Sequence, residues 1–312
     1  MAITVALQMD PVDKINPRTD STYALGLEAA SRGARLLYYP PKALYFRDGK
    51  VGARVRPLEL KPDPADFYRL GEAFEYDLAD ADVILLRQDP PFDMTYITTT
   101  HLLEKLMPKV LVSNNPSEVR NCPEKLFVTG FDGLMTPTLI TADRDQIRAF
   151  RAEYGDIIVK PLYGNGGAGV FRVKPDDGNF SSLLETFAAL TREPLVVQRY
   201  IPAVTTGDKR IILADGEIAG YFLRVSAPGE ARSNLHIGGH AEKCELTVRD
   251  REICERIGPE LKKRGLVFAG IDVIGDYLTE INITSPTGIW EAKALCGINA
   301  AKMIWDGIER RL

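Results

Sequence analysis

The stretch Gly270–Asn282, which reads GIDVIGDYLTEIN, decides the fold. Two apolar runs flank Gly275-Asp276-Tyr277, a pattern that predicts a β-hairpin with a three-residue loop. A hairpin centred on Asp276 places Asp272 directly opposite Glu280, with Asn282 on the same face. Opposed Cα atoms of an antiparallel pair are only about 4.5–5.5 Å apart. Two carboxylates and an amide oxygen therefore converge on one patch.

Oxygen ligands of this kind suit Mg²⁺, which binds through one or two carboxylates together with substrate phosphates. Like charges that face each other destabilise a sheet unless a partner compensates them. The alternative is a solvent-exposed polar face, which the strongly apolar residues between the polar ones disfavour. The metal interpretation assumes this register, because a slip of one residue would separate the oxygens.

Apolar periodicity outward from the hairpin predicts three lobes. The first 120 residues predict a βαβ lobe with a parallel sheet, formed by strands at 3–7, 36–39, 83–86 and 110–112 and a helix over 20–33. The middle predicts an α+β unit, with helices at 143–152 and 181–190 and strands at 157–160, 170–173 and 195–198. The last third predicts antiparallel strands at 209–213, 217–225, 267–273 and 277–282, a helix over 249–263 and a C-terminal helix.

A glycine-dense loop follows Lys160, with Gly164, Gly166, Gly167 and Gly169 closely spaced. Such loops let backbone N–H groups approach an anion. A Rossmann fingerprint is excluded because the loop leads into a strand at 170–173, and a Walker A loop is excluded because Gly-Lys-Ser/Thr is absent. A merely mobile turn remains open for the loop alone, but the adjacent lysine favours a phosphate cover.

Arginines and hydroxyl residues surround the acidic hairpin in sequence. Arg210, Arg224 and Arg232 precede it, and arginine forks match carboxylates and phosphates. Ser285 and Thr287 directly follow it and could bind an anion at a helix start. Singly, each arginine is as well explained as a surface residue, and the hydroxyl pair as an ordinary N-cap.

Composition limits the function classes. The 312 residues carry a formal net charge of −4, which argues against nucleic-acid binding because phosphate neutralisation needs a basic surface. We expect no signal peptide and no membrane span, and therefore a cytoplasmic location. The four cysteines fit no zinc pattern and are expected to be free thiols. His236 and His240 are expected in a loop rather than as a metal pair.

Together these residues resemble the ATP-grasp superfamily, and within it the bacterial glutathione synthetases. The resemblance spans nearly the whole chain. It is carried by Met9–Pro11, Arg87–Asp93, Glu124–Phe127, Lys160–Gly169, Gly207–Arg210, Arg232–Asn234, Gly238-Gly239 and Thr279–Gly288. The segments RQDPPFD and TEINITSPTG distinguish this family from other ATP-grasp ligases.

The resemblance implies an α/β (α+β ATP-grasp) fold in three parts. Residues 1–122 would form an N-terminal substrate lobe, 123–200 a small ATP-grasp lobe with the glycine-rich loop, and 201–312 a large ATP-grasp lobe, with largely antiparallel sheets in the last two. The implied reaction joins γ-glutamylcysteine to glycine, with ATP as co-substrate, through an acyl phosphate, giving glutathione, ADP and phosphate. The family also suggests a homotetramer, and the expected partners are the small-molecule substrates, with no nucleic acid and no membrane.

The resemblance also implies roles for individual residues. Two Mg²⁺ ions would be held by Asp272, Glu280 and Asn282. Arg210 and Lys160 would be catalytic, at the transferring phosphoryl group. The peptide substrate and acyl phosphate would be surrounded by Arg224, Arg232, Asn234, Ser285, Thr287 and Gly288. ATP would be contacted by Lys125, Lys160, Gly164, Gly166, Gly167, Gly169, Gln198, Tyr200, Ile201 and Asp208. Loops 164–169 and 227–241 are candidate lids that keep water from the acyl phosphate.

Three positions depart from the family pattern: Gln88 stands where lysine is common, Asn165 where methionine is frequent, and His240 where an arginine can follow the Gly-Gly pair. They put local contacts in doubt more than the reaction. Two other functions stay open. One is another ATP-grasp carboxylate-amine ligase, and the other is a non-catalytic ATP-binding regulator, which would be expected to have a damaged metal or phosphate site.

Overall fold

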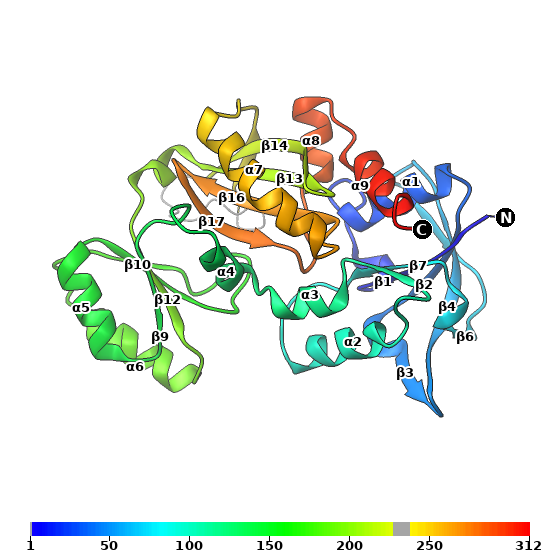
Figure 1. The fold of residues 1–312 in the computed structure, drawn as a ribbon, viewed down its shortest axis with the longest axis horizontal. Helices are drawn as coiled ribbons and strands as arrows, with labels where there is room; N and C mark the ends of the chain where they lie inside the picture. Colours follow the sequence, from blue (N-terminus) through cyan, green and yellow to red (C-terminus); the bar gives the residue numbers. More distant parts are fainter. Residues whose placement is uncertain (1, 227–237) are drawn as a thin grey trace.

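The fold is that of a computed structural model, which describes residues 2–226 and 238–312. It contains three sheets that follow one another along the chain (Figure 1). The first has the order β3-β4-β2-β1-β7-β8. Its parallel strands β1 (Thr4–Met9), β2 (Arg35–Tyr39), β7 (Val83–Arg87) and β8 (Leu111–Ser113) confirm the predicted parallel lobe. Helix α1 (Ser21–Ser31) is also confirmed, with Asp20 accepting the Tyr23 N–H as its cap.

Four antiparallel strands that the sequence analysis left unassigned extend this sheet. They are β3 (Leu44–Arg47), β4 (Lys50–Leu60), β5 (Tyr68–Leu70) and β6 (Phe74–Asp77). The turn between β3 and β4 is Asp48-Gly49, both at positive φ, which is the strongest short-range hairpin signal. Because these strands pair antiparallel, the sheet of this lobe is mixed. Helices α2 (Met94–Glu104) and α3 (Pro116–Asn121) complete the lobe.

The second sheet, β11-β10-β12-β9, is entirely antiparallel and has its own apolar core. Its strands are β9 (Thr138–Thr141), β10 (Ile157–Pro161), β11 (Phe171–Val173) and β12 (Leu195–Arg199). Helices α5 (Arg144–Tyr154) and α6 (Phe180–Leu190) lie on its outer side (Figure 1). This unit matches the predicted α+β unit.

The third sheet, β15-β14-β13-β16-β17, is also antiparallel. Its strands are β13 (Asp208–Ala214), β14 (Glu217–Val225), β15 (His240–Glu242), β16 (Phe268–Ile274) and β17 (Tyr277–Asn282). Helix α7 (Val248–Lys263) packs in one cluster with apolar residues of the first sheet, and α8 (Ile289–Cys296) and α9 (Ala300–Glu309) pack in another. The first and third lobes therefore share continuous cores.

The decisive hairpin has the predicted register but not the predicted loop. Asp272 pairs with Glu280, as expected. The loop has two residues, because Ile274 pairs with Tyr277, and Gly275 at φ 57° occupies the position that type II′ turns give to glycine. The expected three-residue loop is thus wrong. A bulge at Thr279 restores the register, and the Thr279 hydroxyl donates to the Asp272 carbonyl at 3.0 Å.

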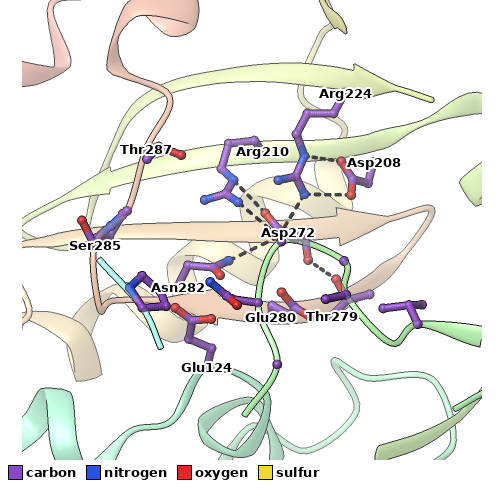
Figure 2. Close-up of a pocket in the computed structure, with 18 of the residues that line it drawn as sticks. Glu124, Asp208, Arg210, Arg224, Asp272, Thr279, Glu280, Asn282, Ser285 and Thr287 are labelled. Carbon is purple, nitrogen blue, oxygen red and sulfur yellow. Dashed lines mark hydrogen bonds and ion pairs between the residues drawn. The ribbon is translucent and has the colours of Figure 1, made fainter. Parts of the chain in front are cut away.

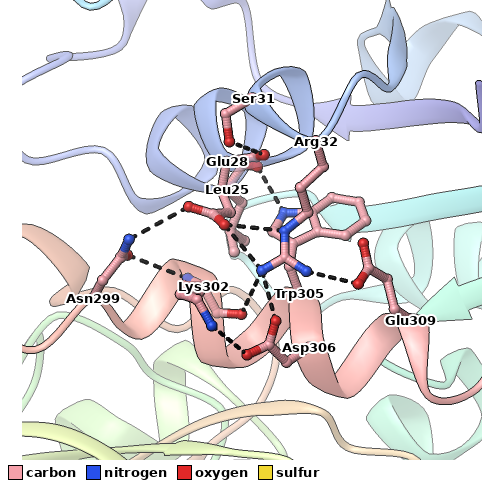
Figure 3. A network of polar contacts seen from close by, with 9 residues as sticks. All are labelled: Leu25, Glu28, Ser31, Arg32, Asn299, Lys302, Trp305, Asp306 and Glu309. Atoms are coloured by element: carbon pink, nitrogen blue, oxygen red, sulfur yellow. Dashed lines mark hydrogen bonds and ion pairs between the residues drawn. The ribbon is translucent and has the colours of Figure 1, made fainter.

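Helix α9 is joined to α1 by a polar network around Arg32 (Figure 3). The Arg32 guanidinium contacts Asp306 at 2.7 Å, Glu309 at 2.8 Å and Glu28 at 2.9 Å. Beneath it, the buried Trp305 indole N–H donates to the Leu25 carbonyl at 2.8 Å. The C-terminal helix thereby fixes α1, whose first residues line the cleft described next. Among the described residues, no helix is long and apolar enough to cross a membrane.

Candidate active site

All three sheets contribute to one cleft of about 1220 Å³. The first sheet contributes the residues that directly follow the parallel strands β1 and β7. Ligands commonly bind at the carboxyl ends of such strands in α/β sheets. The second contributes β10 and its glycine loop, and the third contributes β13, β16 and β17. Figure 2 shows the acidic hairpin and the arginines of β13 and β14 pointing into this space.

Asp272 is the centre of an ion network at the base of the cleft (Figure 2). Its carboxylate lies 2.8 Å from Arg210 Nε and 2.9 Å from Arg224 Nη2. Asn282 Nδ2 donates to Asp272 Oδ2 at 3.3 Å. Strand register explains the arrangement, because Asp272 sits between Arg210 on β13 and Glu280 on β17. The predicted metal ligands and two of the predicted arginines are therefore brought together.

Asp208 holds Arg224 from the neighbouring strand. Arg224 Nε and Nη2 donate to the two Asp208 oxygens at 2.6 and 2.7 Å, a bidentate pair that fixes the guanidinium plane. Burial opposes charge on Arg224, but Asp272 and Asp208 outweigh it and raise the pKa of this guanidinium. Arg224 thus remains a fixed positive charge beside the acidic hairpin.

Glu280 connects the third sheet to the second. Lys160 Nζ, on β10, lies 3.2 Å from Glu280 Oε1. Burial opposes charge on the Glu280 carboxyl, but Lys160 and Lys125 outweigh it and lower its pKa to about 2. Glu280 is therefore an anion at neutral pH, as a metal ligand must be.

Lys125 lies on the short helix α4 (Glu124–Phe127) and points at the glycine loop. Its ammonium donates to the carbonyls of Gly164 and Leu162. Burial lowers the pKa of Lys125, opposed by Glu280. Two buried lysines, Lys125 and Lys160, therefore lie beside the loop that the sequence predicted as a phosphate cover.

The glycine loop ends in strand β11, as the sequence predicted. Gly166 and Gly167, at φ 60° and 79°, line the cleft together with Gly164. Gly169 does not line the cleft, and a Cβ at that position would meet Pro161 at 3.0 Å. Its positive φ of 70° favours glycine at this turn.

The end of β12, the strand that pairs with β10, also lines the cleft. Gln198, Tyr200 and Ile201 all line the cleft. Gln198 Nε2 donates to Thr138 Oγ1 at 3.1 Å, and the Arg172 guanidinium lies 3.7 Å from the centre of the Tyr200 ring. These residues line the same cleft as Lys125, Lys160 and the glycine loop.

The segment after β17 supplies a further wall. Ser285 and Thr287 line the cleft, and the buried Ser285 Oγ has no hydrogen-bond partner among the described residues. Gly288 does not reach the cleft wall: it precedes α8 at φ 113°, where a Cβ would meet the Phe222 ring at 2.9 Å. The predicted residues Arg232 and Asn234, and loop residues 227–237, lie outside the described residues.

The donor set fits Mg²⁺. Asp272 Oδ1 is buried and accepts no hydrogen bond, because the nearby Arg210 Nε–H does not point at it. With the Glu280 carboxylate and the Asn282 amide it forms an oxygen cluster of the kind that Mg²⁺ prefers. The set contains two carboxylates and an amide, and in the described residues no group of three or more His, Cys, Asp or Glu side chains gathers into a metal site.

Several cleft residues were not predicted as site residues. Glu124 precedes Lys125, and burial, reinforced by Glu280, raises its pKa to about 7. Arg87, Asp20 and Asp10 lie at the end that the first sheet contributes. Arg87 is the last residue of β7, and Asp10 directly follows β1. Both could have been identified from the sequence, because ligands commonly bind at the carboxyl ends of parallel strands.

The three departures from the family pattern have different surroundings. The Gln88 side chain is buried, and its Oε1 has no partner in the part of the chain that the structure describes. Asn165 is exposed within the glycine loop and lines the cleft. His240 is exposed on β15 and contacts Glu242 at 2.8 Å. Of the three, only Asn165 lines the cleft.

Family models match two consecutive parts of the chain. Residues 3–120 match the prokaryotic glutathione synthetase N-terminal domain, and residues 124–297 match the prokaryotic glutathione synthetase ATP-grasp domain. The second match alone spans more than half of the 312 residues.

Individual relatives agree with these models. The chain is 57% identical over 311 residues to a glutathione synthetase of Brucella melitensis, with 100% of both chains covered. It is 46% identical to a glutathione synthetase of Pseudomonas putida, covering 100% of this chain and 99% of the relative. Among solved structures, D-cycloserine synthetase DcsG superposes with a TM-score of 0.70 at 13% identity, covering 99% of this chain and 100% of that one, which supports the ATP-grasp fold alone.

Proposed function

The chain belongs to the prokaryotic glutathione synthetase family, and from this premise we propose that its cleft joins γ-glutamylcysteine to glycine while ATP becomes ADP and phosphate. Family membership makes the chain an ATP-dependent ligase. One observation carries the proposal: the oxygen ligands Asp272, Glu280 and Asn282 lie in the same cleft as the ammonium groups of Lys125 and Lys160.

The nucleotide would lie between the second and third sheets. Gln198, Tyr200 and Ile201 would contact adenine and ribose, and Lys125 and Lys160 the phosphates, with Gly164, Gly166 and Gly167 above them. Asp208 would act through Arg224, which it holds by two hydrogen bonds, rather than on ATP itself. This arrangement is supported by the shared lining of one cleft.

Asp272, Glu280 and Asn282 would hold two Mg²⁺ ions. Bound there, the metal would neutralise charge on the ATP phosphates and align the γ-phosphoryl group. Lys160 contacts Glu280 directly, so its ammonium is already positioned beside the place where those phosphates would lie.

The reaction needs an activated carboxyl group. The cysteinyl carboxylate of the peptide would attack the γ-phosphorus, forming an acyl phosphate and releasing ADP. The amino nitrogen of glycine, after losing a proton, would then attack the acyl carbon and expel phosphate. Arg210 would stabilise the phosphoryl charge, since it is fixed at the base of the cleft by Asp272.

The peptide would lie towards the first sheet. Arg224, Ser285 and Thr287 would surround its reacting end. Arg232 and Asn234 remain candidates from the sequence alone. The acyl phosphate must be kept from water, and we assign the cover over its phosphoryl group to loop 164–169.

The division into lobes 1–122, 123–200 and 201–312 is part of the proposal. It is supported by each sheet lying within one lobe. A cytoplasmic location is supported by four free cysteines. Assembly into a homotetramer is proposed from the family resemblance.

The test is an assay of purified protein with MgATP, γ-glutamylcysteine and glycine, following ADP and the tripeptide by mass spectrometry. Equal amounts of ADP and glutathione, formed only when every substrate is present, are expected. ADP release that does not depend on glycine or peptide would contradict the proposal. A non-catalytic ATP binder would give no ADP at all.

A further inference from the structure

Tyr163 joins the root of the glycine loop to the first lobe. It lies between strand β10 and Gly164, and its side chain does not line the cleft. Its ring stacks on that of Phe92, with the ring centres 6.2 Å apart and the ring planes at 24° to each other. Phe92 belongs to the segment between β7 and α2, so this contact crosses from the second lobe to the first.

Phe92 is held from its other side as well. It packs, partly buried, against the core that the first and third lobes share, and its ring centre lies 5.3 Å from that of Tyr96 on α2. Tyr96 is fully buried, and its hydroxyl donates to the Thr284 carbonyl at 3.2 Å, directly before Ser285 of the cleft wall. These contacts connect all three lobes, so Phe92 offers the Tyr163 ring a fixed surface.

The loop that Tyr163 anchors is the one beside the two cleft lysines. The residues on either side of it, Leu162 and Gly164, both offer their carbonyls to the Lys125 ammonium. Closely spaced glycines give the backbone of loop 164–169 many accessible conformations. A loop of this composition needs an anchor to keep one conformation, and the ring stack provides one at the point where the loop leaves β10.

We propose that Tyr163 is a positioning residue, which holds the glycine loop closed over the phosphoryl group by stacking on Phe92. The inference rests on the proposed function and adds to it the contact through which the first lobe controls this cover. An aromatic pair of this geometry shifts an equilibrium between two states by roughly two- to tenfold. A loop released from Phe92 would therefore open more often.

An open loop would admit water to the acyl phosphate. Water would attack in place of glycine, so that phosphate leaves and the peptide regains its free carboxylate. ATP would then be spent without forming glutathione. The predicted defect is a loss of coupling, which is distinct from a general loss of activity.

The first measurement is the ratio of ADP to glutathione formed when every substrate is present. The wild type should form equal amounts of the two, whereas Tyr163→Ala should form at least about twice as much ADP as glutathione. Tyr163→Phe keeps the ring and should restore the wild-type ratio. Phe92→Leu should match Tyr163→Ala, and the double variant should be no worse than either, because both substitutions remove the same contact.

Phe74→Ala is the matched control. Phe74 is 36% exposed, against 37% for Tyr163, and its ring centre lies 6.1 Å from that of Tyr76. Both rings of this control pair belong to β6, so the contact joins no lobes. Phe74→Ala should leave the ratio of ADP to glutathione unchanged.

Hydrogen exchange over residues 162–169 of the substrate-free protein tests the anchor without the reaction. Tyr163→Ala and Phe92→Leu should each exchange at least about twofold faster there than the wild type, and Tyr163→Phe at the wild-type rate. Equal amounts of ADP and glutathione from Tyr163→Ala, additive effects in the double variant, or unchanged exchange in Phe92→Leu would overturn the inference. A wild type that makes no glutathione would instead contradict the proposed function, and the exchange rates would still decide whether the stack holds the loop.

Discussion

Lys160 Nζ lies 3.2 Å from Glu280 Oε1, so a lysine of the second sheet touches a predicted metal ligand of the third. The contact crosses the cleft between lobes that share no core, since the second sheet has its own. It therefore fixes where the two lobes meet at the cleft. When MgATP binds, we expect this ion pair to open, with Lys160 contacting phosphate and Glu280 contacting the metal.

Lys160→Met is expected to lower kcat/KM for ATP at least about 100-fold, because a fixed charge at the phosphoryl group is lost from a buried site. Steady-state kinetics with varied MgATP would measure this. Lys174→Met is the control, an exposed lysine just after β11. Similar kinetics for the two variants would remove Lys160 from the phosphate site.

Glu280→Gln is expected to raise the Mg²⁺ concentration needed for half-maximal activity by at least about tenfold, since a charged oxygen ligand becomes a neutral one. A Mg²⁺ titration at saturating ATP would show it. Glu185→Gln, in an exposed position of α6, should leave the titration unchanged. If Glu280→Gln behaved like that control, the metal site would have to lie elsewhere.

Asp215→Asn should lower the free energy of unfolding at pH 7 by about 1–3 kcal/mol, because Asp215 is buried and bonded by Arg310 and Arg311. Burial would raise the pKa of Asp215, but these arginines outweigh it and hold the pKa below its usual range. The folded pKa lies below the unfolded one, so the contribution is complete above about pH 4 and is lost as pH falls through the folded value.

Thermal melting from pH 7 to pH 2.5 would test this, with the difference between the wild type and Asp215→Asn shrinking towards acid. Asp48→Asn is a matched control. Both aspartates begin an Asp-Gly turn at φ near 50°, which asparagine tolerates, but the Asp48 side chain is 87% exposed. A difference that stayed constant with pH would show that the Asp215 charge is not what stabilises the turn.

Arg32 and Asp306 should be energetically coupled, because their contact joins α1 to α9 (Figure 3). A double-mutant cycle with Arg32→Met and Asp306→Asn is expected to give about 0.5–1.5 kcal/mol from urea unfolding, modest because both groups are partly exposed. Strictly additive variants would mean that this ion pair contributes nothing to the junction between the helices.

The hairpin shows what a sequence can predict of a site. Alternation places Asp272, Glu280 and Asn282 on one face, and the structure confirms their convergence. The predicted register is right although the predicted loop is wrong. The actual turn is one residue shorter, which shifts the pairing by one residue, and the bulge at Thr279 shifts it back. Alternation alone does not reveal bulges, since a bulge depends on how the neighbouring strand pairs.

Other parts of the site could not be derived from local patterns. Lys125, Lys160 and Asp272 come from three separate elements, and only the family resemblance connected them before the lobes were assembled. Strands β3 to β6 were not predicted, although Asp48-Gly49 is a hairpin signal and β4 alternates apolar and polar residues from Val51 to Arg56. Arg87 could be predicted from the sequence only as part of a motif, since its burial depends on α1 and the chain at Pro286.

The central claim is that the cleft activates the cysteinyl carboxylate as an acyl phosphate that glycine captures. The most direct measurement uses γ-glutamylcysteine with ¹⁸O in that carboxylate, and follows the label in the released phosphate by mass spectrometry. The account predicts one labelled oxygen in each phosphate, and glutathione in equal amount. Unlabelled phosphate, formed while glutathione accumulates, would contradict it.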